Sequence, residues 1–384
     1  MTRDWSLWPW PFFEEKHRSL ASSIASWKCP VEGEVEEPAL EEACRAIAKS
    51  LGEKGFLESV VPQLGEKVDV RSACVVREAI SYQSVLADCV IAMQGIGTGA
   101  IWLHGSDEQK AQYLEPARRG EKIAAFALTE PTTGSDVANI ATTARKDGSD
   151  YILDGGKTFI SNAPFADHYI VVARTGEGPG AKGLSAFIID AGTKGMVAGE
   201  PIHLMAPHPV APLTFENCRL PSSSMIGEPG KGFRIAMETF DIFRTSVGAA
   251  CVGMARRAID ETLDRVNERR LFGGTMAEIP GVQSKLADMS IDLDVAALTV
   301  YRAAWMKDTT GGRCTREVSV AKYAATEAAG RIVDSAVQLF GGLGVTRGSV
   351  VEQLYREVRP ARLYEGASEV QKLVIARNLL AEGY

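Results

Sequence analysis

The sequence has little that would bind a metal ion or form a disulfide framework. Its seven cysteines are scattered over 384 residues without a C-x-x-C pair, and its five histidines form no H-x-x-x-H spacing. Such pairs are the usual sequence sign of a zinc site, and an odd, widely spaced set of cysteines is typical of reduced thiols. We therefore expect no metal and a reducing environment.

Long apolar runs and runs of one charge are also absent. No stretch of 18 or more apolar residues occurs, and residues 1–18 lack the basic and apolar regions of a signal peptide. Forty-two Lys and Arg stand against 49 Asp and Glu, a net charge of −7 without a basic run. No G-x-S-x-G elbow of the hydrolase type occurs. These absences predict a cytoplasmic protein with no membrane or nucleic-acid partner.

What the sequence does contain is a hydrophobic spacing that changes twice. Apolar residues recur every three or four positions in the first third, short β-rich runs follow, and the helical spacing returns in the last third. This order predicts an α+β protein with an N-terminal helical domain (1–121), a middle antiparallel β-domain (122–226) and a C-terminal helical bundle (227–384). Because strands and helices do not alternate, a doubly wound parallel sheet is improbable.

Local signals refine this outline. Ser106 followed by Gln109 predicts a helix N-terminus with a capping box, and residues 146–148 and 154–156 are typical of hairpin turns. Two glycine clusters, at 95–99 and 341–344, follow helical segments, which favours close helix packing or a helix C-cap over a dinucleotide-binding loop. The β-rich runs predict strands around residues 151–153, 169–173, 184–189 and 213–215.

Three motifs have both a functional and an ordinary interpretation. The segment 129–136, T-E-P-T-T-G-S-D, combines hydroxyls with a Gly-Ser pair that a flat ligand can approach closely, but it also suits a plain Ser/Thr turn. Phe159 and Ser161, two residues apart on one face of a predicted strand, suit a heteroaromatic ring or the core. Glu365 lies beside Tyr364 as either a base of raised pKa or a solvated carboxylate.

Taken together and in order, these segments closely resemble the acyl-CoA dehydrogenase family. The match covers nearly the whole chain after about residue 70. The resemblance implies a C-terminal four-helix bundle, with FAD and acyl-CoA bound between it and the β-domain, and a homotetramer or dimer in which each flavin touches a neighbouring subunit. The matching motifs are residues 104–110, 113–114, 126–131, 134–136, 156–157, 160–162, 286–289, 338–342, 363–366 and 368–371.

The resemblance also implies the chemistry. Glu365 would remove the α-proton of the thioester while the β-hydrogen leaves as hydride to flavin N5, giving a trans-2-enoyl-CoA. Its backbone N–H and a ribityl hydroxyl of FAD would polarise the thioester carbonyl. Some members carry the base at the position of Phe243, which cannot act as one, so Glu365 would act alone. An electron-transferring flavoprotein would accept the electrons.

The residues that match the family's cofactor and substrate positions differ from it at a few places. Phe159 stands where Trp is common, Ser161 replaces a Thr, Ile279-Pro280 replaces a Phe-Gln pair, and Ala367 replaces a Thr. The matched cofactor residues are Phe126, Leu128, Thr129, Gly134, Ser135, Phe159, Ser161, Arg269, Phe272, Gln338 and Gly342. The matched substrate residues are Ser135, Cys89, Ala92, Met93, Ile96, Asp241, Phe243, Arg244 and Gly366.

Bulky Met93 and Phe243 would occupy volume that a long acyl chain needs, so we expect a short or compact acyl group. Two alternatives remain. An acyl-CoA oxidase would share Glu365 and FAD but pass electrons to oxygen, although the length of 384 residues favours a dehydrogenase. A catalytically diverged flavoprotein would keep only the fold, although the intact Glu365 argues against it.

Overall fold

The structure is a computed structural model that describes residues 10–382. Within this range the chain divides into two compact units. The first unit contains residues 10–28, 69–88 and 244–382, and the second unit contains residues 29–68 and 89–243. The boundaries predicted at residues 121 and 226 stay a prediction.

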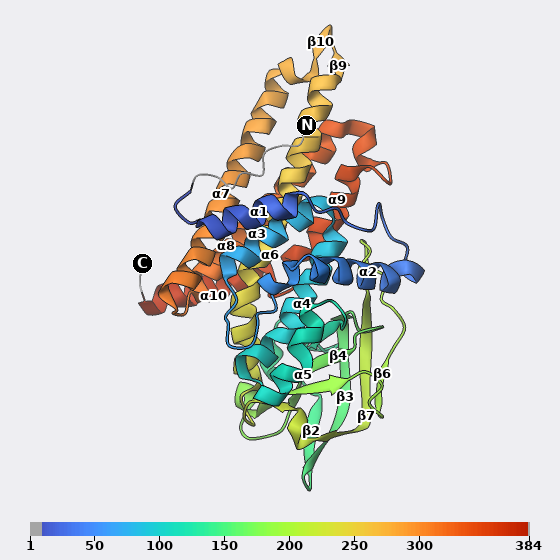
Figure 1. The fold of residues 1–384 in the computed structure, drawn as a ribbon. Coiled ribbons are helices and arrows are strands. Elements are labelled where there is room, and N and C mark those ends of the chain that lie inside the picture. The colour runs from blue at the N-terminus through green and yellow to red at the C-terminus, as the bar shows by residue number, and fades with distance from the viewer. Residues whose placement is uncertain (1–9, 383–384) are drawn as a thin grey trace. The chain divides into compact units, whose positions relative to one another are not determined.

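The helices and strands follow the predicted order of helices, strands and helices (Figure 1). The first unit holds α1 (Glu15–Ala25), α3 (Val70–Gln83), β9 (Arg270–Leu271), β10 (Gly274–Thr275), α7 (Pro280–Thr310), α8 (Thr315–Phe340), α9 (Val350–Val358) and α10 (Ser368–Glu382). The second unit holds α2 (Leu40–Glu53), α5 (Asp107–Arg118), β1 (Ala124–Ala127), β2 (Thr143–Asp147), β3 (Asp150–Ser161), β4 (His168–Arg174), β5 (Leu184–Asp190), β6 (Met196–Ala198), β7 (Val210–Pro221) and β8 (Met225–Ile226). Helices α4 (Val85–His104) and α6 (Gly232–Glu268) contribute to both units.

The second unit is built on one sheet of the order β6-β7-β3-β2-β4-β5-β8, with β1 paired to β4. All four predicted strands are confirmed. Most pairs are antiparallel, as predicted, but β1 and β2 each run parallel to β4. The first six residues of both β4 and β5 are buried. Such continuous burial explains why their sequences are mainly apolar, because both faces of these strands are covered.

Strand β3 is irregular where the sequence suggested a turn. The turn at residues 146–148 is confirmed, because Asp147 pairs with Asp150 and Gly148 has a φ of 64°. The turn predicted at residues 154–156 is wrong. That segment lies inside β3, where a register shift against β7 marks a bulge and Gly155 has a φ of 140°. Glycine signals a bulge as readily as a turn, since both need unusual backbone angles.

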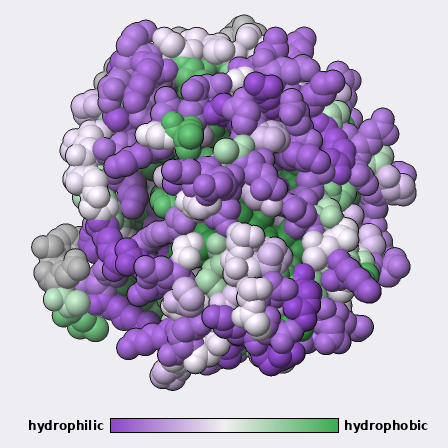
Figure 2. Space-filling view, turned by 60° about the horizontal axis from the view of Figure 1, so that its bottom comes forward, coloured by the Kyte–Doolittle hydropathy of each residue, from purple (hydrophilic) through white to green (hydrophobic). Residues whose placement is uncertain are grey.

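Helix α4 is apolar because it is a core element. By length and composition alone it could cross a membrane. However, 78% of its most apolar 18-residue stretch is buried inside the protein, as in the core helix of many folds. Its glycines allow this close packing, as predicted. A Cβ at Gly95 would lie 2.6 Å from the Phe243 ring, and one at Gly97 would lie 2.5 Å from Ala124 Cβ. The molecular face in Figure 2 is mainly hydrophilic.

The remaining local predictions concern helix ends and cysteines. Ser106 and Gln109 form the predicted capping box, and the Gln109 amide also donates to the carbonyl oxygens of Ser223 and Met225, which fixes α5 to the β8 edge. Gly341, with a φ of 64°, is the C-cap of α8. All seven cysteines are free. In the first unit, α8 packs between α7 and α10 to form the core of the predicted bundle.

Candidate functional site

Glu365 lies in a tight turn before α10 that three side chains hold in place. Its φ is 52°, and that of Gly366 is 92°. Arg244 Nε donates to the Glu365 carbonyl oxygen at 3.0 Å. Lys322 Nζ and Gln371 Nε2 donate to the Gly366 carbonyl oxygen at 2.8 and 2.9 Å. A non-glycine residue in the left-handed region persists only where its surroundings fix it, and these contacts do so.

The Glu365 carboxyl has an unusual electrostatic environment. Its Oε2 atom is buried and has no hydrogen-bond partner among the described residues. Burial raises the pKa of this carboxyl above its ordinary value, while the positive charges of Arg77, Lys322 and Arg244 lower it. Burial also lowers the pKa of Lys322 to about 8. A buried carboxylate with an unused oxygen and nearby cations is suited to take up a proton from a ligand.

A buried ion pair supports this cationic surrounding. Arg77 Nε and Nη2 each lie 2.8 Å from an oxygen of Asp88, and Arg77 Nη1 donates to Ser246 Oγ at 2.9 Å. The guanidinium is therefore fixed, so its charge acts on Glu365 from a constant position. Glu327, which accepts from Arg362 and Ser368, fixes the two ends of the Glu365 turn.

In the second unit, a buried ion pair fixes the 129–136 segment against β3. Lys157 Nζ lies 2.7 Å from Glu130 Oε1 and donates to the Leu128 carbonyl oxygen at 3.2 Å. Glu130 also accepts from the backbone of Ala141 and Thr142. Within the segment, Gly134 and Ser135 are exposed, and the buried Thr133 Oγ1 has no hydrogen-bond partner among the described residues.

Phe159 projects from a second bulge in β3. The register against β7 shifts between Lys157 and Ile160, and Phe159 has a φ of 55°. Phe159 is exposed, Ile160 is buried and Ser161 is half-buried. That Phe159 and Ser161 lie on one face of the strand stays a prediction, because the bulge is next to Phe159. The Phe159 side chain is 59% exposed. An aromatic residue held outward by the backbone offers a flat apolar surface for a ring to contact.

Ser161, at the end of β3, contacts a histidine. Its Oγ lies 2.7 Å from His208 Nε2. Burial lowers the pKa of His208 to about 4, so the imidazole is neutral at pH 7. In the same unit, the Phe126 ring packs edge-on against Phe240 with centroids 5.3 Å apart. The partly buried Thr129 and the buried Leu128 continue the chain from β1.

The predicted acyl-pocket residues share one face of α4. Ala92 and Ile96 are buried, and Cys89 and Met93 are half-buried. The spacing of three and four places them along one side of the helix. Phe243 of α6 is fully buried against Gly95 and Gly99 of the same helix. Of the remaining predicted substrate residues, Asp241 is half-buried and Arg244 is nearly buried.

The other predicted cofactor residues lie on the surface of the first unit. Phe272 occupies the turn of the β9–β10 hairpin with a φ of 54° and is 98% exposed. Arg269 beside it is exposed, as are Gln338 and Gly342 at the end of α8. The hairpin lies beyond the ends of α6 and α7 (Figure 1). A fully exposed aromatic side chain beside an exposed guanidinium is an unusual surface feature.

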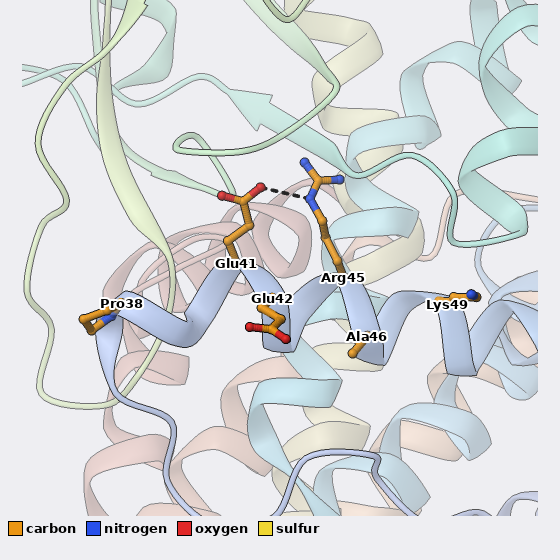
Figure 3. A pocket seen from close by; sticks show the side chains of 6 residues that line it. All are labelled: Pro38, Glu41, Glu42, Arg45, Ala46 and Lys49. Atoms are coloured by element: carbon orange, nitrogen blue, oxygen red, sulfur yellow. Dashed lines mark hydrogen bonds and ion pairs between the residues drawn. The ribbon is translucent and has the colours of Figure 1, made fainter.

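A shallow hollow on the second unit carries no comparable chemistry. It is lined by α2 and the residues before it, and Arg45 forms an ion pair with Glu41 there (Figure 3). Its lining residues are Pro38, Glu41, Glu42, Arg45, Ala46 and Lys49. No group of three His, Cys, Asp or Glu side chains suited to a metal occurs in the part of the chain that the structure describes.

Sequence reasoning missed several residues that shape these sites. Lys322 and Arg77 near Glu365 stand on two other helices, so no local spacing connects them to it. Gln371 belongs to a matched motif, but its contact with the turn depends on the fold. The sequence marks His208 only as one of five histidines without metal-binding spacing. Lys157 and Glu130 belong to matched motifs, but their pairing depends on strand β3 returning beside residue 130. A Lys or Arg on the apolar face of a predicted helix could have indicated these residues, because such side chains are rarely buried without a partner.

Three family models and several known proteins match this chain. Family models described as acyl-CoA dehydrogenase N-terminal, middle and C-terminal domains match residues 14–121, 125–218 and 230–380. A 3-(aryl)acrylate reductase of Clostridium sporogenes is 40% identical over 96% of this chain and 100% of its own. A caffeyl-CoA reductase–Etf complex subunit of Acetobacterium woodii is 35% identical over 96% and 99%. The structure of butyryl-CoA dehydrogenase from Megasphaera elsdenii is 29% identical, with a TM-score of 0.88 and coverage of 96% and 99%.

Proposed function

Because this chain belongs to the acyl-CoA dehydrogenase family of FAD-dependent oxidoreductases that act on CH–CH bonds, we propose that it converts an acyl-CoA thioester to the trans-2-enoyl-CoA. Glu365 is the base that removes the α-proton. The observation that carries this proposal is the buried Glu365 Oε2, which has no partner among the described residues and lies in a turn fixed by Arg244, Lys322 and Gln371.

The surroundings of Glu365 suit a base that acts near neutral pH. Burial makes the protonated form accessible after the α-proton is taken, and the charges of Arg77, Lys322 and Arg244 keep the carboxylate accessible before that step. The three donors to the turn bind its carbonyl oxygens and leave the carboxyl free to meet a substrate. We expect the backbone N–H of Glu365 to donate to the thioester carbonyl, where negative charge develops as the proton leaves.

The residues present fit FAD. In the second unit, the outward Phe159 ring suits contact with the isoalloxazine, and the exposed Gly134-Ser135 backbone beside the unpartnered Thr133 hydroxyl suits its polar edge. When bound, FAD supplies a two-electron acceptor for the β-hydrogen. In the first unit, Arg269 and Phe272 suit the pyrophosphate and adenine of FAD bound to a neighbouring subunit, with Gln338 and Gly342 completing that contact.

The acyl group that we propose is short or compact. Met93 and Phe243 restrict the α4 face that carries Ala92 and Ile96, and a long chain needs the volume that they fill. The similarity to a butyryl-CoA dehydrogenase supports this size. We further propose an electron-transferring flavoprotein as the electron acceptor, supported by the relative named as an Etf complex subunit, and a homotetramer or dimer in the cytoplasm.

A second candidate is the reverse reaction on an aryl-substituted 2-enoyl group. It is favoured by the 40% identity to a 3-(aryl)acrylate reductase over nearly the full chain. The same carbon–carbon bond reacts in both directions, so Glu365 would then return a proton to the α-carbon. This candidate uses the same base and cofactor and differs in the acyl group and the direction of electron flow.

Anaerobic titration of the FAD-loaded protein separates these candidates. The panel would contain butyryl-CoA, octanoyl-CoA and 3-phenylpropionyl-CoA, with flavin absorbance as the readout. Bleaching by butyryl-CoA but not by octanoyl-CoA is the expected result for a short acyl group. Bleaching by 3-phenylpropionyl-CoA alone, with reoxidation of reduced flavin by cinnamoyl-CoA, would favour the aryl candidate. No bleaching by any thioester would contradict both, and rapid peroxide formation in air would indicate an oxidase.

A further inference from the structure

The contact between Ser161 and His208 is fixed by the strands on either side of it. Ser161 ends β3 and pairs with Val210, the first residue of β7. The next residue, Asn162, donates its backbone N–H to the Pro209 carbonyl oxygen at 2.7 Å. These two backbone pairings therefore place residue 208 diagonally across from residue 161, two positions from its partner Val210. This register brings the two side chains together, and Ser161 Oγ lies 2.7 Å from His208 Nε2.

Counting protons assigns the direction of this hydrogen bond. The neutral imidazole carries one proton, on either Nε2 or Nδ1. His208 Nδ1 is buried and has no hydrogen-bond partner among the described residues. A proton there would be a buried donor without an acceptor, which is rarer and costlier than a lone pair without a donor. The Nε2–H tautomer avoids this cost, so the imidazole donates and Ser161 Oγ accepts.

The proton of the Ser161 hydroxyl is then not used in the hydrogen bond with His208. A serine hydroxyl rotates freely unless a partner fixes it, and His208 is its only side-chain partner in the described part of the chain. Once Oγ accepts from the imidazole, rotation about the Cβ–Oγ bond keeps the hydroxyl proton away from the imidazole. The proton is available to an acceptor outside the protein.

We propose that His208 is a positioning residue for FAD, which holds the Ser161 hydroxyl so that its proton is presented to the isoalloxazine ring. The inference rests on the proposed function and on the prediction from the family resemblance that Ser161 contacts the flavin. Its new element is the role of His208, which acts on the flavin only through Ser161. A hydrogen bond to a flavin nitrogen changes the electron density of the ring, so the flavin itself reports on this arrangement.

The test compares the FAD-loaded wild type with Ser161→Ala, His208→Leu and the double variant. The readouts are the flavin midpoint potential and the visible absorption spectrum. We expect Ser161→Ala to shift both, His208→Leu to shift them in the same direction by roughly the same amount, and the double variant to match Ser161→Ala, since residues that act as one unit are not additive. His208→Gln, whose side-chain amide can donate from a similar position, should restore most of the wild-type potential and spectrum.

Three results would overturn the inference. His208→Leu could leave the potential and spectrum unchanged while Ser161→Ala shifts both. His208→Leu could also shift them further in the Ser161→Ala background, which would show that it does not act through the hydroxyl. If Ser161→Ala itself changes neither readout, the predicted contact of Ser161 with the flavin fails, and the inference fails with it, whereas the proposed reaction of Glu365 is unaffected. His203→Leu is the matched control, because His203 lies in the same segment but is exposed and pairs with Glu37; it should change neither readout.

Discussion

Two turns of the molecule use the same backbone conformation for opposite purposes. Glu365 in the first unit and Phe159 in the second unit are both non-glycine residues with φ near 50°. Charged side chains from α6 and α8 fix the Glu365 turn, and its functional atom is buried. The Phe159 turn is a bulge fixed by the strand ladder, and its ring is exposed. A left-handed backbone thus fixes the direction of both side chains. Their surroundings decide whether the side chain presents a buried carboxyl group or an exposed aromatic ring.

The largest loss of stability should come from breaking the ion pair next to the Phe159 bulge. In Lys157→Met the buried Glu130 loses its cation, and we expect the free energy of unfolding to fall by about 3–5 kcal/mol. Urea unfolding measures this. Adding Glu130→Gln to Lys157→Met should recover a large part of the loss, because no buried charge then lacks a partner. Equal stability of wild type and Lys157→Met would show that the pair does not support the bulge.

Gly366→Ala should cause the next largest loss of stability. The new Cβ would lie 2.4 Å from Gln371 Nε2, in a backbone conformation with a φ of 92°. Left-handed strain alone costs about 1–3 kcal/mol, and displacing Gln371 adds to it and disturbs Glu365. Gly348→Ala is the matched control, since its φ is 89° and its surroundings are open. Both variants should lose stability in urea unfolding, but only Gly366→Ala should also slow flavin bleaching by the substrate. Equal bleaching rates would contradict the account of this turn.

Phe159→Ala should weaken FAD binding without affecting Glu365. Losing an aromatic contact with the flavin should raise the dissociation constant of FAD about tenfold. Leu64→Ala, at a position of the same unit that is exposed to a similar degree, serves as the control and should leave FAD affinity unchanged. Fluorescence titration of the apoprotein with FAD measures both. An unchanged affinity in Phe159→Ala would remove this residue from the proposed flavin site.

Lys322→Met should produce a modest change in the pH profile. The Lys322 charge lowers the pKa of Glu365, as do Arg77 and Arg244, whereas burial and Asp88 raise it. Without Lys322 the pKa of Glu365 rises, so the base becomes a carboxylate only at higher pH. The acidic limb of kcat/KM should therefore move to higher pH. Lys285→Met, on the exposed surface of α7, should leave it in place. A limb that stays fixed or moves to lower pH would contradict this electrostatic role.

The sequence predicted elements well where the pattern is local. The continuous apolar runs of β4 and β5 predicted strands, and the capping box at Ser106 predicted a helix start; both are confirmed. The turn at 154–156 was mistaken because its glycines also suit a bulge inside a strand. A bulge depends on how β3 pairs with β7, about 60 residues later in the chain, and no local pattern records that pairing.

The site could be predicted only in part for the same reason. Glu365 and Ser161 lie in short motifs that resemble a family, so their positions could be proposed from sequence. Lys322 and Arg77, which set the charge around Glu365, reach it through the packing of helices distant in sequence. His208 reaches Ser161 through a strand pairing. Burial, rather than residue type, gives these side chains their importance, and burial is a property of the folded chain.

The most direct test of the central claim is the rate at which substrate bleaches the flavin in wild type and in Glu365→Gln. The glutamine keeps the shape of the side chain and cannot take up a proton. The saturated acyl-CoA that bleaches the wild type most rapidly would be mixed with both proteins anaerobically. We predict that Glu365→Gln retains FAD and bleaches about 10²–10⁴-fold more slowly. Bleaching at the wild-type rate would show that another group removes the α-proton and would contradict the assignment of Glu365 as the base.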